Sequence, residues 1–119
     1  MSSSILCVTI DCTAPARLAD FWSQALGYKA RRDLPNGAHL IAEDEQTMPW
    51  LAFTPVAETK ATKNRLHLDL RPDDQEAEVA RLVALGATRA EVGQSVDASW
   101  VVLADPEGNE FCVLPSRTA

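Results

Sequence analysis

At 119 residues, the chain has the length of one domain and can bury a hydrophobic core without disulfides or a structural metal. Apolar residues make up 46% and charged residues 24%, the usual proportions of a soluble globular protein. The net charge of -6 argues against nucleic acid and anionic membranes as partners, because both kinds of binding need clustered Lys and Arg.

The N-terminal residues and the cysteines indicate a cellular compartment. The start of the chain has no basic segment, and no apolar run reaches the length of a signal sequence or a membrane span. Three cysteines without the spacing of a disulfide framework fit a reducing environment. We therefore expect a cytoplasmic protein with free thiols.

The opening stretch predicts a strand with two different faces. Apolar and polar residues alternate from 5 to 11, and successive side chains of a strand point to opposite faces. The face expected to pack in the core carries Leu6, Val8 and Ile10. The other face carries Cys7, Thr9 and Asp11.

A helix is predicted next, because apolar residues recur at helical spacing from Leu18 to Leu26. Thr13 is its expected N-cap, Pro15 suits the first turn, and Gly27 supplies the left-handed stop.

Three strands should follow this helix, over 28–33, 38–43 and 50–54, with a turn at 35–37. In the last of them, Leu51 and Phe53 are expected to face the core. The opposite face would then carry Trp50, Ala52 and Thr54.

The second half of the chain repeats this order. Alternation over 65–71 predicts a strand that turns Leu66, Leu68 and Leu70 to the core and His67, Asp69 and Arg71 away from it. Asp73 and Glu76 have the spacing of a capping box, for a helix that presents Val79, Leu82 and Val83.

The end of the second half predicts three more strands, over 87–92, 100–103 and 110–114. A loop is expected over 94–98, and the turn-forming residues of 105–109 connect the last two strands. In the closing strand, the core side carries Phe111 and Val113, and the other side carries Glu110 and Cys112.

Each half thus reads strand, helix, strand, strand, strand, which predicts an α+β fold made of a duplicated module. The single domain 1–119 would contain one module at about 4–56 and a second at about 64–115, joined by a linker over 55–64. In each module a helix would cover one sheet face. If the two remaining faces meet, the mixed, curved sheets line a cup.

These motifs, in this order, resemble the vicinal oxygen chelate superfamily of glyoxalases, bleomycin-resistance proteins and extradiol dioxygenases. The resemblance rests on the stretch from Asp105 to Cys112, on the strand start 65–68 and on the helix end 21–27. It implies two βαβββ modules around a cup. Small members of this group commonly form a homodimer, which the open sheet edges also favour.

The resemblance also implies where a metal would bind. In metal-using members the ligands come from the first and last strands of both modules, and the matching positions here hold His67, Cys7 and Cys112. Cys112 stands where a glutamate is usual. The fourth position falls on Ala52 or Thr54, and neither is a good ligand.

Two interpretations of Cys7, His67 and Cys112 stay open. Two thiolates and an imidazole suit zinc, copper(I) or iron, and three protein ligands leave one coordination position for a substrate. Alternatively, the cysteines are small apolar side chains of a dry pocket, and His67 is a hydrogen-bonding residue of its wall. We expect no cofactor, with a divalent metal such as zinc or iron as the alternative.

Carboxylates and an aromatic ring complete the expected site. Asp11, Asp69 and Glu110 face the cup, where burial and mutual repulsion could raise a carboxyl pKa for acid or base catalysis. Pairing with Arg71 on the same face is the expectation we favour. Trp50 could stack on a flat ligand.

For function, the expectation is metal-free binding of a small, partly planar organic molecule, as in bleomycin-resistance proteins. A metal-dependent lyase, isomerase or dioxygenase, with Glu110 or Asp69 moving a proton, is the alternative, and an interaction module with a vestigial pocket is a third. Whether the chain is an enzyme stays open. The expected ligand-binding residues are Cys7, Thr9, Asp11, Trp50, Thr54, His67, Asp69, Arg71, Glu110 and Cys112.

Overall fold

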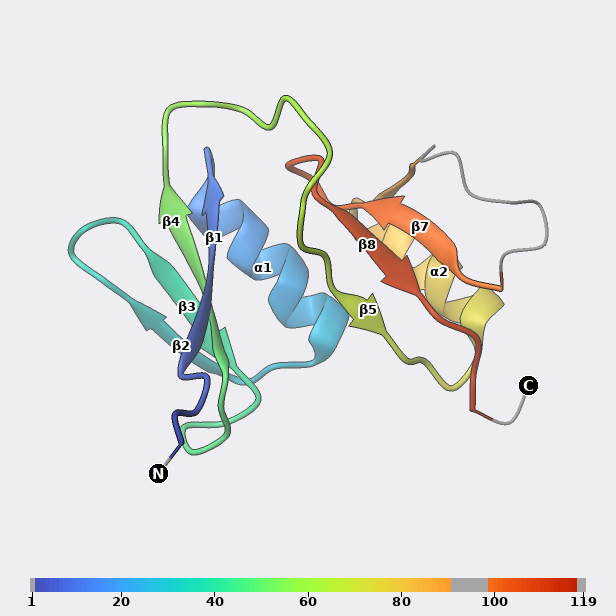
Figure 1. The fold of residues 1–119 in the computed structure, drawn as a ribbon, viewed down its shortest axis with the longest axis horizontal. Coiled ribbons are helices and arrows are strands. Elements are labelled where there is room, and N and C mark those ends of the chain that lie inside the picture. Colours follow the sequence, from blue (N-terminus) through green and yellow to red (C-terminus); the bar gives the residue numbers. More distant parts are fainter. Residues whose placement is uncertain (1, 91–98, 118–119) are drawn as a thin grey trace. The chain divides into compact units, whose positions relative to one another are not determined.

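The computed structural model describes residues 2–90 and 99–117, which belong to two compact units, Met1–Thr59 and Lys60–Ala119. Each unit repeats the predicted order of strand, helix and three strands (Figure 1). The elements are β1 (Cys7–Cys12), α1 (Pro15–Leu26), β2 (Ala30–Asp33), β3 (His39–Ala42), β4 (Trp50–Pro55), β5 (Asp69–Leu70), α2 (Gln75–Leu85), β6 (Thr88–Arg89), β7 (Val101–Ala104) and β8 (Glu110–Val113). The predicted α+β fold with a duplicated module is confirmed.

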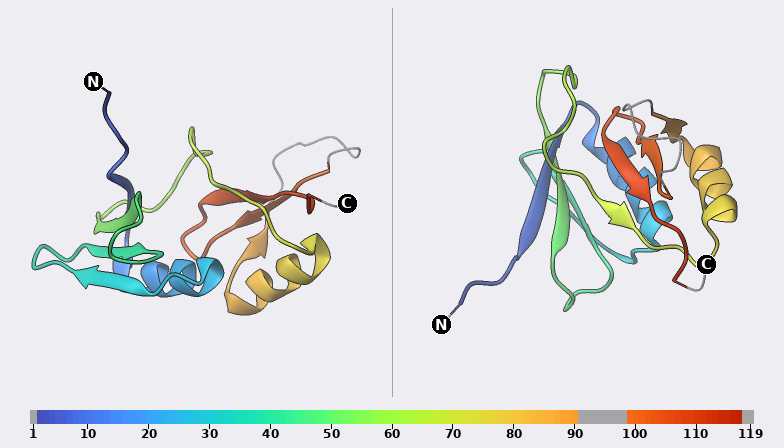
Figure 2. Two further views of the ribbon diagram at one scale, coloured as in Figure 1. Left: turned by 90° about the horizontal axis from the view of Figure 1, so that it is seen from below. Right: turned by 45° about the vertical axis from the view of Figure 1, so that its right-hand side comes forward.

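The first unit is a mixed sheet with α1 on one face. Its strands lie in the order β1-β4-β3-β2, and β1 runs parallel to β4 while the other pairs are antiparallel. The helix packs on β3 and β4, where Ile41 and Phe53 are fully buried (Figure 2). The buried residues of α1 are Leu18, Ala19, Phe21, Trp22 and Ala25. Their helical spacing is the one that the sequence predicts.

The second unit has the same plan. Its strands lie in the order β5-β8-β7-β6, and β5 runs parallel to β8. The helix α2 lies on one side of this sheet, where Leu82 is buried along with Phe111 and Val113 of β8 (Figure 2). Burial of these side chains is the main driving force that holds helix and sheet together.

The turn before β8 is formed as the sequence predicts. The Asp105 carboxylate accepts hydrogen bonds from the backbone amides of Glu107 and Asn109, at 2.9 and 3.0 Å. Gly108 has a φ of 89°, a conformation that glycine adopts without steric cost. This turn fixes the register in which β8 returns along β7.

The two N-caps differ from the prediction. At α1 the capping position is Ala14 rather than Thr13, and it makes no side-chain cap hydrogen bond. At α2 the cap is Asp74 rather than Asp73, and its carboxylate accepts from the Ala77 amide at 3.1 Å. Each cap lies one residue later than predicted, and at α2 the cap residue Asp74 is still extended, with φ -140° and ψ 109°.

The strands that open the two units are shorter than predicted. The strand β1 begins at Cys7, so Leu6 is exposed rather than in the core. Only Asp69–Leu70 of the predicted strand 65–71 pairs as a strand, and Leu66 is 85% exposed. Alternation shows which side a residue takes but not where the neighbouring strand stops. Val83, which the helical spacing predicts as a buried residue of α2, is exposed as well.

The remaining predictions fall into two groups. The strands expected at 28–33, 38–43, 50–54, 100–103 and 110–114 are present with small shifts of their ends. The loop expected over 94–98, and positions 91 and 92 of the strand expected over 87–92, lie outside the described residues. Within the described part of the chain, no helix is long and apolar enough to cross a membrane.

The cap assignment at α2 gives a direct test. Asp74→Ala should lower the free energy of unfolding by about 1 kcal/mol, because it removes the acceptor for an amide of the first turn. Asp73→Ala is the matched control. It should change the free energy of unfolding by only a few tenths of the loss expected for Asp74→Ala. Urea unfolding of both variants measures these changes. An equal loss of stability in both would contradict the assignment of Asp74 as the N-cap of α2.

Candidate functional site

The open face of the second sheet brings together side chains from three strands. In the pairing register, Cys112 of β8 has Asp69 of β5 on one side and Val102 of β7 on the other. Phe111 and Val113 point to the opposite face, towards α2. Cys112 therefore lies in the middle of a row that faces away from the helix.

An open hollow of about 430 Å³ lies over this row. Its apolar part comes from β7, β8 and their flanks. Its polar and charged part comes from the segment before β5, from β5 itself and from the start of β8. The lining residues are Lys63, His67, Asp69, Trp100, Val102, Glu110, Cys112 and Leu114. All of them belong to the second unit.

Asp69 is the centre of the polar contacts in the hollow. His67 Nε2 lies 3.1 Å from Asp69 Oδ1. Burial, together with the charge of Asp69 and a hydrogen bond to it, raises the pKa of the Cys112 thiol, although Lys63 opposes the shift. The thiol therefore keeps its proton at neutral pH and donates it to the Asp69 carboxylate.

His67, Asp69 and Cys112 also make a donor set for a metal ion. One nitrogen, one oxygen and one sulfur lie within 4.8 Å of one another. Zinc accepts all three of these ligand types, and three protein ligands leave one position for water or a substrate. A metal that binds here must displace the thiol proton, so the affinity should rise with pH.

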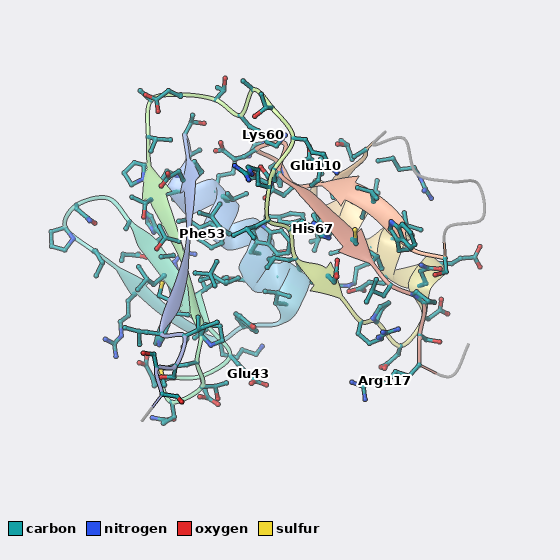
Figure 3. All side chains as sticks on the ribbon, in the orientation of Figure 1. Glu43, Phe53, Lys60, His67, Glu110 and Arg117 are labelled. Atoms are coloured by element: carbon teal, nitrogen blue, oxygen red, sulfur yellow. The ribbon has the colours of Figure 1, made fainter. Side chains whose placement is uncertain are left out.

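Glu110, at the edge of the hollow, is held by two donors. Its carboxylate lies 2.7 Å from Lys60 Nζ and accepts the backbone amide of Asn64 at 3.0 Å (Figure 3). Burial opposes ionisation, but the hydrogen bonds from Lys60 and Asn64 prevail and hold the pKa of Glu110 below its usual range. The raised pKa considered for a catalytic carboxylate is therefore wrong for Glu110.

Four of the ten expected binding residues meet in this hollow: His67, Asp69, Glu110 and Cys112. Arg71 takes another position, where its guanidinium donates to the Pro115 carbonyl. The favoured pairing of a site carboxylate with this arginine is replaced by the contacts of Asp69 with His67 and of Glu110 with Lys60.

The other five expected binding residues lie in the first unit. The register pairs Cys7 with Trp50, Thr9 with Ala52 and Asp11 with Thr54, so these side chains share one face of β1 and β4. The shared face is the one that alternation predicts. The guanidinium of Arg32 lies over the Trp50 ring, 5.1 Å from its centre. It takes the position in which a flat ligand was expected to stack. The approach of Cys7 to a metal stays a prediction.

Sequence reasoning missed four lining residues, which are Lys63, Trp100, Val102 and Leu114. Trp100 precedes Val102 by two positions, and Val102 pairs with Cys112. Assigning faces to the strand that begins at Val101 would have placed Trp100 with Cys112. Lys63 had no such signal, since it lies in a segment without regular secondary structure.

Comparison with protein families covers nearly the whole chain. The model of a family described as a glyoxalase-like domain matches residues 7–114. No curated protein sequence is matched significantly.

Solved structures share the fold at low sequence identity. A glyoxalase/bleomycin resistance protein/dioxygenase family enzyme from Burkholderia phytofirmans PsJN is 20% identical, with 93% of this chain and 97% of that chain covered and a TM-score of 0.68. TnmS3, an antibiotic binding protein from Streptomyces sp. CB03234, is 18% identical, with 97% of each chain covered and a TM-score of 0.62.

A third solved structure is a mutant of the fosfomycin resistance protein FosX from Listeria monocytogenes, complexed with Mn(II) and a dihydroxypropylphosphonic acid. It is 11% identical, with 98% of this chain and 92% of that chain covered and a TM-score of 0.72. At such identities the likeness shows the fold alone.

The lowered pKa of Glu110 predicts how stability depends on pH. A carboxyl group whose pKa is lower in the folded state stabilises the fold above its unfolded pKa, and this contribution is lost as the pH falls through the folded value. Glu110→Gln should therefore cost about 1.5 kcal/mol at neutral pH. The cost should shrink as the pH falls below 4.5, the ordinary value for this group.

Chemical unfolding of wild type and Glu110→Gln over a range of pH measures this difference. Glu58→Gln, in the exposed part of the linker, is the control and should follow wild type throughout. A gap between wild type and Glu110→Gln that is the same at neutral and at acidic pH would contradict the assigned ion pair.

Proposed function

Because this chain belongs to the glyoxalase-like domain family, we propose that it binds a small, partly planar organic molecule in the hollow of its second module. The observation that carries the proposal is the combination of Trp100 with the polar groups around Asp69 in one open hollow. Apolar walls with a few convergent polar groups are typical of small-molecule sites.

The two sides of the hollow suit different parts of such a ligand. Trp100 is 41% exposed, so its ring offers a face on which a planar group can stack, next to Val102 and Leu114. Lys63 on the other side can donate hydrogen bonds to oxygen atoms of the ligand. The expected ligand therefore has a flat apolar part and an oxygen-rich end.

The contacts of Asp69 support a binding site that works without a metal. Asp69 accepts from the protonated Cys112 thiol and lies beside His67, so these three side chains satisfy one another. Its volume of about 430 Å³ falls in the range of roughly 300–1,000 Å³ that is usual for small-molecule pockets. That TnmS3, an antibiotic binding protein, has the same fold is consistent with the proposal.

Tryptophan fluorescence tests this proposal, with anilinonaphthalene sulfonate as a planar, anionic probe. Trp22 and Trp50 are 2% and 7% exposed, so contact with the probe should quench mainly Trp100. Trp100→Phe should remove most of the quenching, because the exposed indole is gone, and should weaken probe binding a few-fold, because the smaller ring keeps only part of the stacking surface.

Trp50→Phe is the matched control, since it removes a tryptophan from the open face of the first unit. It should leave the affinity for the probe unchanged. Binding that survives in Trp100→Phe and is lost in Trp50→Phe would move the site to the first unit and overturn the proposal.

A second candidate function is supported by the donor set of His67, Asp69 and Cys112. These three residues would hold zinc or iron. When bound, the metal would act as a Lewis acid on a substrate oxygen, as in metal-dependent lyases, isomerases or dioxygenases. The chain's own contribution would be to hold the substrate against Trp100.

Elemental analysis of protein purified without chelators separates the two candidates. The metal-dependent function predicts stoichiometric zinc or iron, lost together with a thiol ligand in Cys112→Ala. Cys12→Ala, in the first unit, is the control for removal of a buried cysteine and should keep the metal. Protein that binds the fluorescent probe equally well before and after dialysis against a chelator would support the metal-free function.

A further inference from the structure

We propose that Glu110 is a positioning residue, which acts with Lys60 and Asn64 as a clamp on segment 60–68. The clamp consists of the Glu110 carboxylate, the Lys60 ammonium group and the Asn64 backbone amide. This inference rests on the proposed function, because segment 60–68 supplies Lys63 and His67 to the hollow.

The segment needs such a clamp because it forms neither helix nor strand. Its backbone joins β8 at its far end, where the Cys112 amide donates to the Leu68 carbonyl at 2.9 Å. Without a hydrogen-bonded ladder before that point, a chain of this length would sample many conformations. Contacts with side chains of β8 must therefore fix the beginning of the segment.

Glu110 provides these contacts from the first position of β8. One carboxylate oxygen lies 2.7 Å from Lys60 Nζ, and the other accepts the Asn64 amide at 3.0 Å. The side chains of Glu110 and Lys60 are only 15% and 18% exposed, so water weakens the ion pair little. A further hydrogen bond joins Asn64 Nδ2 to Asn109 Oδ1 at 3.3 Å.

The clamp determines where His67 can lie. His67 stands between Asn64, which Glu110 holds, and Leu68, which Cys112 holds. Both oxygens of Glu110 are occupied and its charge is neutralised by Lys60, so it is poorly suited to bind a ligand or carry a proton. Its contribution to binding therefore passes through the segment that it fixes.

Lys60→Met is the decisive variant, because Lys60 is not among the residues that line the hollow. It removes the ion pair and keeps most of the aliphatic length of the side chain. Lys60→Arg keeps the charge and is the conservative rescue. Asp74→Ala, which weakens the cap of α2 in the same unit, is the control for a general loss of stability.

The first readout needs no ligand. In Lys60→Met, exchange of the Asn64 amide should accelerate about tenfold, because its acceptor is no longer held in place. The ring signals of His67 in proton–nitrogen spectra should shift, while those of His39, the other histidine, should stay unchanged. Lys60→Arg should resemble wild type in both measurements.

The second readout is the affinity for anilinonaphthalene sulfonate. Lys60→Met should weaken it several-fold, whereas Asp74→Ala should leave it unchanged. Unchanged exchange and unchanged His67 signals in Lys60→Met would overturn the proposal. So would an affinity that falls in Glu110→Gln but not in Lys60→Met, since Glu110 would then contact the ligand directly. If wild type does not bind the probe at all, the proposed function fails, and the His67 signals alone decide on the clamp.

Discussion

The position of β8 inside its sheet is the constraint on which the candidate site depends. Because β8 pairs with β5 on one edge and β7 on the other, Cys112 lies between Asp69 and Val102. The period of two then turns Phe111 and Val113 to α2, where they are buried. The same pairing therefore builds the core and presents the site on opposite faces of one strand.

The chemistry of the hollow follows from the residues that meet at Asp69. Its carboxylate lies next to an imidazole and accepts from a thiol whose pKa is raised, so the three groups form a closed set of partners. This set can serve as one polar wall of a binding pocket, or it can release a proton and bind a metal. Trp100 would serve either proposed function, because a flat substrate and a flat ligand need the same apolar surface.

The sequence was sufficient for the fold and for the faces of its strands. Alternation placed Cys7 on the side of Trp50 and His67 on the side of Asp69, which agrees with the register of β1 with β4 and with the contact of His67 with Asp69. It could not show that Leu66 lies beyond the paired part of β5, since that depends on where the partner strand stops.

The partners of charged side chains were harder to predict than the faces. Glu110 pairs with Lys60, fifty residues earlier in the chain, and Arg71 bonds a backbone carbonyl instead of a carboxylate. Such contacts depend on the path of a segment without regular structure, which no periodic pattern records. The clamp at Glu110 and the lining position of Lys63 could therefore be seen only in the structure.

The most direct measurement is a map of amide signals as a small planar molecule is added to the whole chain. With anilinonaphthalene sulfonate, the largest changes should fall on Asp69, on 100–102 and on 110–114, the strands that border the hollow. Changes concentrated on β1 and β4, around Trp50, or on the helix-covered face of the second sheet would contradict a site on its open face.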